Sequence, residues 1–254
     1  NNDRKSIDRE ITQEALEMVQ NGSALSTDAA TIVYNPTWNK GVVGIVASRL
    51  VEAFYKPTIV LTKSNGFITG SARSVAGFDL YEAIESCADL LENFGGHVYA
   101  AGLTLKEGNL EEFVGRIDQF IAGKITEEML TPMTDIDAKL EFSQITPKFF
   151  RLLKQFQPFG PGNTNPVFLT ENVSDGGNGR KVGAGGVHMK LDLIDEKQPF
   201  HQIPAIAFNM AEFYDYIKAG NPFDICYSIV ENYYRGNTTL QLRIKDIKER
   251  DEFI

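Results

Sequence analysis

The sequence predicts a mixed α/β domain followed by a small all-β barrel, with one helix in front of both. Between residues 30 and 123, short β-branched runs alternate with amphipathic segments, which is typical of an α/β domain. Residues 157–166, "QPFGPGNTNP", hold three prolines and two glycines and interrupt any regular element. From residue 188 onward apolar and polar residues alternate, which is the pattern of half-buried strands.

The first predicted element is a helix over residues 3–20, and Asn21-Gly22 ends it. Its apolar residues recur at the spacing of one helical face. We expect this helix to be the end of a longer connector. The residues on that face are Ile7, Ile11, Ala15, Leu16 and Val19.

A βαβ unit is predicted next, with strands over 30–34 and 56–62 and a helix over 41–54 between them. Both strands are rich in valine and isoleucine, which indicates a buried parallel pair. Residues 66–74 then predict a further strand that leads into a polar loop.

Two more helices are predicted in the α/β region, over residues 79–94 and 109–123. Asp79 with Glu82 three residues later resembles a capping box, and Asn109 is the expected cap of the second helix. The segment "GGH" (95–97) is then a loop after the first helix, and residues 100–105 form a strand.

The third part is predicted to begin at Thr146-Pro147, with a short helix that has proline at its first position. Several short strands in about 90 residues fit a closed barrel of the OB-fold type. The expected parts are a connector helix (1–22), an α/β domain (23–146), and a linker helix with an OB-fold (147–254). The clearest strands are 188–194, 203–209, 224–234 and 239–247, the last two joined by a hairpin turn.

The formal net charge of −9 argues, taken alone, against a polyanionic partner. The charge is uneven, however: residues 36–75 carry +4, residues 76–146 carry −10 and residues 147–192 carry +3. A local basic surface is therefore compatible with the acidic total. Scattered charges on a solvated surface are the competing interpretation.

Two cysteines far apart, Cys87 and Cys226, match no metal spacing and suit a reducing cytoplasm. No apolar run reaches the length of a membrane helix, and we expect a cytoplasmic protein. With three histidines, two cysteines and no D-H-H motif, a metal site within this sequence is not expected.

Two segments of the α/β domain are candidates for binding phosphate. In "GSARS" (70–74), Arg73 offers a planar set of donors, and Ser71 and Ser74 add hydroxyls. In "GGH", Gly95 and Gly96 allow close approach of the backbone to an anion, and His97 adds a donor. Each segment alone is better explained as an ordinary turn, but both are predicted at strand–helix junctions of one α/β domain, where open sheets place ligands.

The β domain offers cations and tyrosines of the kind that bind single strands in OB-folds. For any one of them, a core tyrosine or a solvated cation is an equally good interpretation. The candidates are Lys181, Lys190, Tyr233, Tyr234, Arg235 and Arg243.

Six ordered blocks resemble the C-terminal part of RecJ-type exonucleases, which belong to the DHH phosphoesterase superfamily and digest single-stranded DNA 5′→3′. The resemblance covers nearly the whole chain. The blocks are "NNDRKSIDREITQEAL", "YNPTWNKGVVGIVASRL", "GSARS", "FGGHVYAAGLTL", "PFGPGNTNPVF" and "ENYYRGNTTLQLRIKDI".

The resemblance implies roles for the candidate residues. Ser71, Arg73, Ser74 and the Gly95-Gly96-His97 segment would hold phosphates near two Mn²⁺ or Mg²⁺ ions, with His97 as the catalytic candidate. The metal ligands belong to an N-terminal domain of the family that this sequence lacks, so we expect a fragment that is inactive alone. Asn39 stands where the family has a histidine after the tryptophan.

The implied partner is single-stranded DNA, together with a single-strand-binding protein or a helicase of the repair pathway. Two other functions remain open from the sequence. One is a DHH phosphodiesterase for oligoribonucleotides or cyclic dinucleotides, which generally lacks the C-terminal barrel. The other is a non-catalytic module that binds single strands, with the α/β part as a scaffold.

Overall fold

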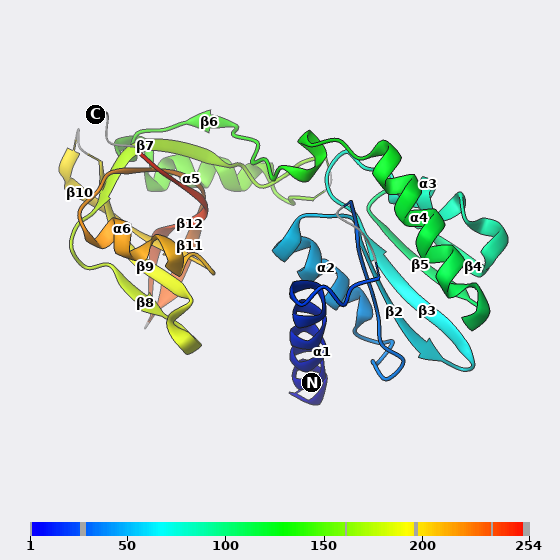
Figure 1. Cartoon of the computed structure of the whole chain (residues 1–254). Helices are drawn as coiled ribbons and strands as arrows, with labels where there is room; N and C mark the ends of the chain where they lie inside the picture. Colours follow the sequence, from blue (N-terminus) through cyan, green and yellow to red (C-terminus); the bar gives the residue numbers. More distant parts are fainter. Residues whose placement is uncertain (1, 26–28, 161, 196–197, 235, 251–254) are drawn as a thin grey trace. The chain divides into compact units, whose positions relative to one another are not determined.

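The structure, a computed structural model, describes residues 2–25, 29–160, 162–195, 198–234 and 236–250 of the chain. These residues form two compact units, Asn1–Pro132 and Met133–Ile254, each with its own sheet (Figure 1). Within the described ranges, every helix is too short or too polar to span a bilayer.

The first unit is built on a five-stranded sheet with the order β1-β2-β3-β5-β4. β1 and β2 run parallel, as the predicted βαβ unit requires, and the other pairs are antiparallel. The strands are β1 (Thr31–Tyr34), β2 (Thr58–Ser64), β3 (Phe67–Arg73), β4 (Leu91–His97) and β5 (Ala100–Leu105).

Helices cover both faces of this sheet (Figure 1). α1 (Asn2–Gln20) and α2 (Val43–Phe54) pack on one face, and α3 (Leu80–Glu85) and α4 (Leu110–Lys124) pack on the other. The buried strand residues alternate between the two cores, as Ile32 and Val33 do on β1. The sheet is thus the central layer of the unit.

The N-terminal helix is fixed to this unit by polar contacts as well as by apolar packing. The buried Asp8 carboxylate accepts from Arg49 of α2 at 2.7 Å. Trp38 Nε1 donates to Glu14 at 2.8 Å. These contacts hold α1 in one orientation against α2.

The helix predicted over residues 79–94 is wrong beyond Glu85. Asp79 does cap α3 by accepting from the Glu82 amide, but a 3₁₀ turn follows at Ala88–Leu90 and β4 begins at Leu91. Cys87 and Leu90 remain in the core through this change. The apolar period therefore continues across the helix end and conceals it.

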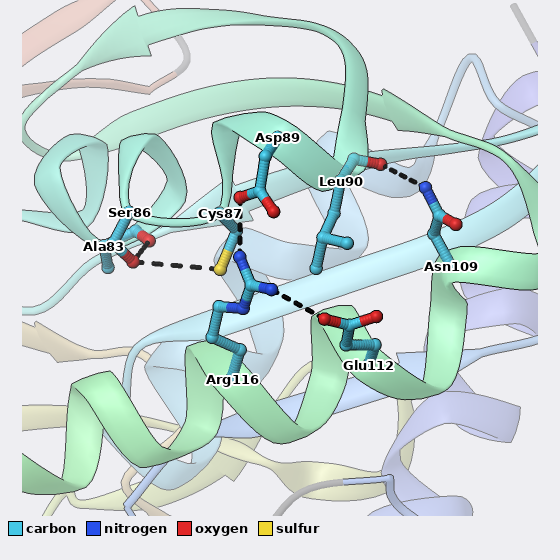
Figure 2. A network of polar contacts seen from close by, with 8 residues as sticks. All are labelled: Ala83, Ser86, Cys87, Asp89, Leu90, Asn109, Glu112 and Arg116. Carbon is cyan, nitrogen blue, oxygen red and sulfur yellow. Dashed lines mark hydrogen bonds and ion pairs between the residues drawn. The ribbon is translucent and has the colours of Figure 1, made fainter.

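Asn109 occupies the N-cap position of α4, as expected, but it does not cap the helix through its side chain. Its side chain makes no cap hydrogen bond and instead donates to the Leu90 carbonyl at 2.9 Å. Arg116 of α4 adds ion pairs to Asp89 and Glu112 (Figure 2). Together these bonds attach α4 to the turn that precedes β4.

The second unit contains seven strands in the order β6-β7-β11-β12-β10-β9-β8, with an additional pairing of β7 with β9. β10 and β12 are parallel, β6 pairs in parallel with β7, and the other pairs are antiparallel. The strands are β6 (Ala138–Lys139), β7 (Phe168–Asp175), β8 (Arg180–Val182), β9 (His188–Asp195), β10 (Gln198–Ala207), β11 (Phe223–Tyr234) and β12 (Asn237–Glu249).

Two short helices, α5 (Pro147–Leu153) and α6 (Tyr214–Lys218), pack against this sheet. Thr146 caps α5 as expected, by accepting from the Phe149 amide. Residues 133–146, assigned to the first domain from the sequence, belong to the second unit, because Leu140 and Phe142 lie in its core. The remaining short 3₁₀ helices are Glu107–Asn109, Glu128–Leu130, Phe142–Gln144, Lys154–Phe156, Ala184–Gly186 and Ala211–Phe213.

Candidate nucleic-acid interface

Three neighbouring strands bring "GSARS" and "GGH" into register. Arg73 of β3 and His97 of β4 both lie opposite Ala100 of β5. One row further along, Ser71 and Gly95 both lie opposite Gly102. Directly opposed residues point to the same face of a sheet, so these two rows form one surface.

This surface is the face that carries α2, because the alternate residues Ala72 and Ala101 point into the core on the α3 and α4 side. Gly44 of α2 lies against β3. A Cβ atom on Gly44 would be 3.1 Å from Arg73 Nη2 and 3.2 Å from Ser71 Oγ. The glycine therefore allows α2 to approach the two candidate side chains closely.

The sequence reasoning missed Gly44. Its only signal was a glycine inside an otherwise regular amphipathic helix, where glycine is unfavourable by about 1 kcal/mol relative to alanine. Such a glycine indicates a close approach of another group, which the structure identifies as Arg73.

Between Ser71 and the outer edge of the sheet, the surface consists of exposed backbone. Gly102 and Gly95 are both exposed, and a Cβ atom on Gly95 would meet nothing within 4 Å. An extended ligand could lie directly against the peptide groups here.

Gly96 has a different role from Gly95. It lies opposite Ala101, and its φ is +156°. A Cβ atom there would be 2.3 Å from the Ala100 carbonyl oxygen and 2.5 Å from Ala101 Cα. Gly96 is thus required by the packing of β4 on β5, whereas Gly95 leaves the surface open.

Arg73 is held against the sheet by its own neighbours. Its Nη1 donates to Ser71 Oγ at 3.0 Å and to the Ala72 carbonyl at 2.8 Å. None of the ion pairs in the described ranges includes Arg73. Its positive charge is therefore available to an anion on the surface.

Ser74 stabilises a turn. Its hydroxyl donates to the Phe78 carbonyl at 2.8 Å, and its amide donates to the Tyr99 carbonyl at 3.1 Å. The Leu80 amide binds the Val98 carbonyl at 3.0 Å. These bonds fix the tip of the β4–β5 hairpin next to the exposed His97.

The "GGH" segment is the end of β4, and the expected loop after a helix is wrong. The expected location of both segments at strand–helix junctions is also wrong for "GGH", since a β-hairpin follows it. The antiparallel register brings the segments together instead.

In the second unit, two of the predicted DNA-binding residues share a row. Lys190 of β9 and Arg243 of β12 both lie opposite Ile206 of β10. Arg180 of β8 lies opposite Lys190 and extends this row, which the sequence reasoning had not identified. Three exposed cations therefore follow one another across four strands.

Lys181 is separate from this row. It lies opposite Met189, which is fully buried in the core, so it points to the other face of β8. There its Nζ lies 5.0 Å from the centroid of the Tyr214 ring. Tyr233 is exposed, Tyr234 is placed only as the last residue of β11, and Arg235 lies outside the described residues.

Within the part of the chain that the structure describes, neither unit contains an evident metal centre. Among the described residues, no group of three or more His, Cys, Asp or Glu side chains could hold a metal ion. Asn39, at the family's histidine position, accepts from the Gly41 amide at 2.8 Å and so stabilises the turn before α2.

Comparison with known families matches both units. Residues 27–123 match the DHHA1 domain, and residues 136–246 match the RecJ OB domain. The chain joins a DHHA1 domain to a RecJ OB domain.

Over nearly its whole length, the chain matches the C-terminal portion of RecJ exonucleases. It is 36% identical to the single-stranded-DNA-specific exonuclease RecJ of Bacillus subtilis, covering 97% of this chain and 31% of that protein. It is 31% identical to RecJ of Haemophilus influenzae, covering 99% and 44%. The chain thus spans less than half the length of these relatives.

A crystal structure of RecJ from Thermus thermophilus in complex with Mn²⁺ has the same fold. It superimposes with a TM-score of 0.75 at 24% identity, covering 99% of this chain and 35% of that one. The fold of this chain therefore occurs within that larger structure.

Proposed function

We propose that this chain is the substrate-binding C-terminal part of a RecJ-type exonuclease that digests single-stranded DNA 5′→3′ in repair and recombination, in the cytoplasm. The observation that carries the proposal is the row formed by Arg73, Ala100 and His97. It presents a cation that has no ion-pair partner among the residues described by the structure, and an exposed imidazole, on one glycine-lined surface. The family matches support the assignment to nucleic acid.

In this proposal the surface of the first unit formed by the rows Arg73–Ala100–His97 and Ser71–Gly102–Gly95 binds a phosphate of the DNA strand. Arg73 and His97 donate to its oxygens, and Ser71 Oγ orients the guanidinium. The bare backbone at Gly95 and Gly102 lets the strand lie flat against the sheet. These residues bind and orient the scissile phosphate.

The metal ions of such an enzyme would bind outside the described residues, since these provide no ligand group. Divalent ions would supply an activated water and neutralise phosphate charge. No step of that chemistry is assigned to this chain, and we expect it to lack nuclease activity alone.

We also propose that the second unit is a closed OB barrel that guides the strand. β7 pairs with β11 on one side and with β9 on the other, so the strands β7, β11, β12, β10 and β9 follow one another in a ring. The row of Arg180, Lys190 and Arg243 crosses the outer face of β8, β9 and β12. In OB-folds the second and third strands, here β9 and β10, form the usual binding face.

A DHH phosphodiesterase for short oligoribonucleotides or cyclic dinucleotides is the weaker alternative. The match of residues 136–246 to the RecJ OB domain favours the exonuclease, since that alternative generally lacks this part.

The proposal is tested by binding of labelled oligo(dT) to the purified chain. Affinity should fall steeply between about 50 and 200 mM salt, because several cations displace counterions. Arg73→Ala should weaken binding, whereas Lys63→Ala, which also removes one charge but from an ion pair with Glu107, should not. No binding at low salt, or equal loss in both variants, would contradict the proposal.

A further inference from the structure

Phe208 is a large aromatic residue that remains exposed beside the row of Arg180, Lys190 and Arg243. Phe208 directly follows β10, and its side chain is 43% exposed. Single exposed apolar residues are common on protein surfaces, and what distinguishes Phe208 is the contact of its ring with cationic and aromatic neighbours.

The Phe208 ring is held by two neighbours. The Arg243 guanidinium lies 5.1 Å from the ring centroid, which is a cation–π contact. His188 contacts the ring edge-to-face, with centroids 5.2 Å apart and an interplanar angle of 74°. Both neighbours come from strands next to β10.

His188 is itself fixed in place. Its Nδ1 accepts from the Asn209 amide at 3.0 Å, and Asn209 has a φ of +57°. A Cβ atom on Gly183 would be 2.8 Å from His188 Cδ2, so the imidazole rests on that glycine. Because the imidazole is fixed, the phenyl ring is positioned before any ligand arrives.

The fixed ring lies beside the cation row. Arg243 belongs to that row and to the contact with Phe208, and Lys190 follows His188 by two residues on the same face of β9. A protein partner that binds by burying apolar surface would have only the Phe208 ring to contact here. A single nucleic-acid strand would find both an aromatic platform and cations for its backbone.

We propose that Phe208 is a stacking platform for an unpaired nucleobase, positioned by His188 and Arg243, while Lys190 and Arg180 bind the adjoining phosphates. This inference rests on the proposed function of the OB unit in guiding a single strand. It assigns that unit contacts with bases in addition to contacts with phosphates. In a duplex the base faces are covered by stacking on the neighbouring base pairs, so the platform selects single strands.

The test compares two labelled oligonucleotides of about 15 residues, which is near the site size of one OB-fold. One is oligo(dT) and the other has the same backbone with abasic residues. Binding to the 254-residue chain is measured by fluorescence anisotropy at fixed salt. Phe208→Ala should bind oligo(dT) roughly tenfold more weakly and the abasic strand equally well.

Two further variants separate stacking from charge. Phe208→Trp should keep affinity for oligo(dT), and its fluorescence should be quenched on binding, above any change from Trp38, which is buried in the other unit. Lys190→Ala should weaken binding of both oligonucleotides by a similar factor.

If Phe208→Ala leaves oligo(dT) binding unchanged, or weakens both oligonucleotides equally, the stacking platform is wrong while strand binding stands. A wild-type chain that binds neither oligonucleotide overturns the proposed function and this inference with it.

Discussion

Arg73 and His97 lie opposite the same residue, Ala100, from the two strands that flank β5. Neighbouring strands are about 4.8 Å apart, so the two backbones are separated by roughly 10 Å. A phosphate above Ala100 is within reach of both side chains. From the register of the three strands we therefore propose one anion position between the guanidinium and the imidazole.

Shared contact with one phosphate predicts coupling between the two residues. We expect Arg73→Ala and His97→Ala each to reduce exonuclease kcat/KM, and the double variant to lose less than the sum of both in free energy. The measurement uses a hybrid in which this chain replaces the matching segment of the Bacillus subtilis relative, with the unsubstituted hybrid as reference. Strictly additive losses would show that the two side chains bind different groups.

The sequence indicated both halves of this surface but could not place them together. "GSARS" was correctly predicted as the end of a strand, because its apolar alternation is local. "GGH" was expected after a helix, because Cys87 and Leu90 keep the helical period across a 3₁₀ turn. Pairing of β4 with β5 depends on contacts that no local pattern records.

In the second unit as well, the sequence predicted local alternation but not the pairing of neighbouring strands. Alternation along residues 188–194 correctly predicted that Lys190 faces outward. Lys181 was grouped with it, because the face of β8 depends on its pairing with β9, which the sequence does not state. Phe208 was overlooked because a single aromatic residue at the end of a strand is more often part of a core.

A methyl group at Gly44 should disturb the phosphate site without unfolding the domain. In Gly44→Ala, the new Cβ would lie 3.1 Å from Arg73 Nη2 and 3.2 Å from Ser71 Oγ, so the guanidinium and the hydroxyl would have to shift away from it. We expect oligo(dT) affinity to fall roughly fivefold, since about 1 kcal/mol of a charge-assisted hydrogen bond is lost. Titration by anisotropy measures this change.

The matched control is Gly115→Ala on α4, where a Cβ atom would meet nothing within 4 Å. Both variants gain helix propensity, by up to about 1 kcal/mol, and neither should lower the melting temperature. A similar loss of affinity in Gly115→Ala would show that the loss in Gly44→Ala does not arise from the contact between residue 44 and Arg73.

The two glycines of "GGH" should respond oppositely to alanine. Gly96→Ala forces a Cβ atom to within 2.3 Å of the Ala100 oxygen at positive φ, and we expect a loss of a few kcal/mol in unfolding free energy. Gly95→Ala meets nothing within 4 Å and should keep the melting temperature while weakening oligo(dT) binding. Thermal melts with binding titrations measure both, and equal destabilisation would contradict the assigned roles.

The buried Tyr227 predicts a loss of stability of the OB unit at alkaline pH. Thr170 Oγ1 donates its only hydrogen to the Leu140 carbonyl at 2.8 Å, so the Tyr227 hydroxyl, 2.8 Å away, donates to Thr170. Burial raises the pKa of Tyr227 to about 12, because the phenolate would be desolvated. The unfolded chain ionises near pH 10, so stability should be complete below that pH and fall as pH rises toward 12, by on the order of 2 kcal/mol.

Tyr227→Phe separates this contribution from those of the other tyrosines and the lysines. The variant should lose about 1 kcal/mol at pH 7, because one buried hydrogen bond is gone, and should lose less additional stability between pH 10 and 12 than the parent chain. Thr170→Val should cost more at pH 7, about 1–3 kcal/mol, because the Leu140 carbonyl and the Tyr227 hydroxyl both lose their partner. Urea unfolding at several pH values measures these differences. Parallel pH profiles of the parent and Tyr227→Phe would show that Tyr227 ionises as readily in the folded chain as in the unfolded one.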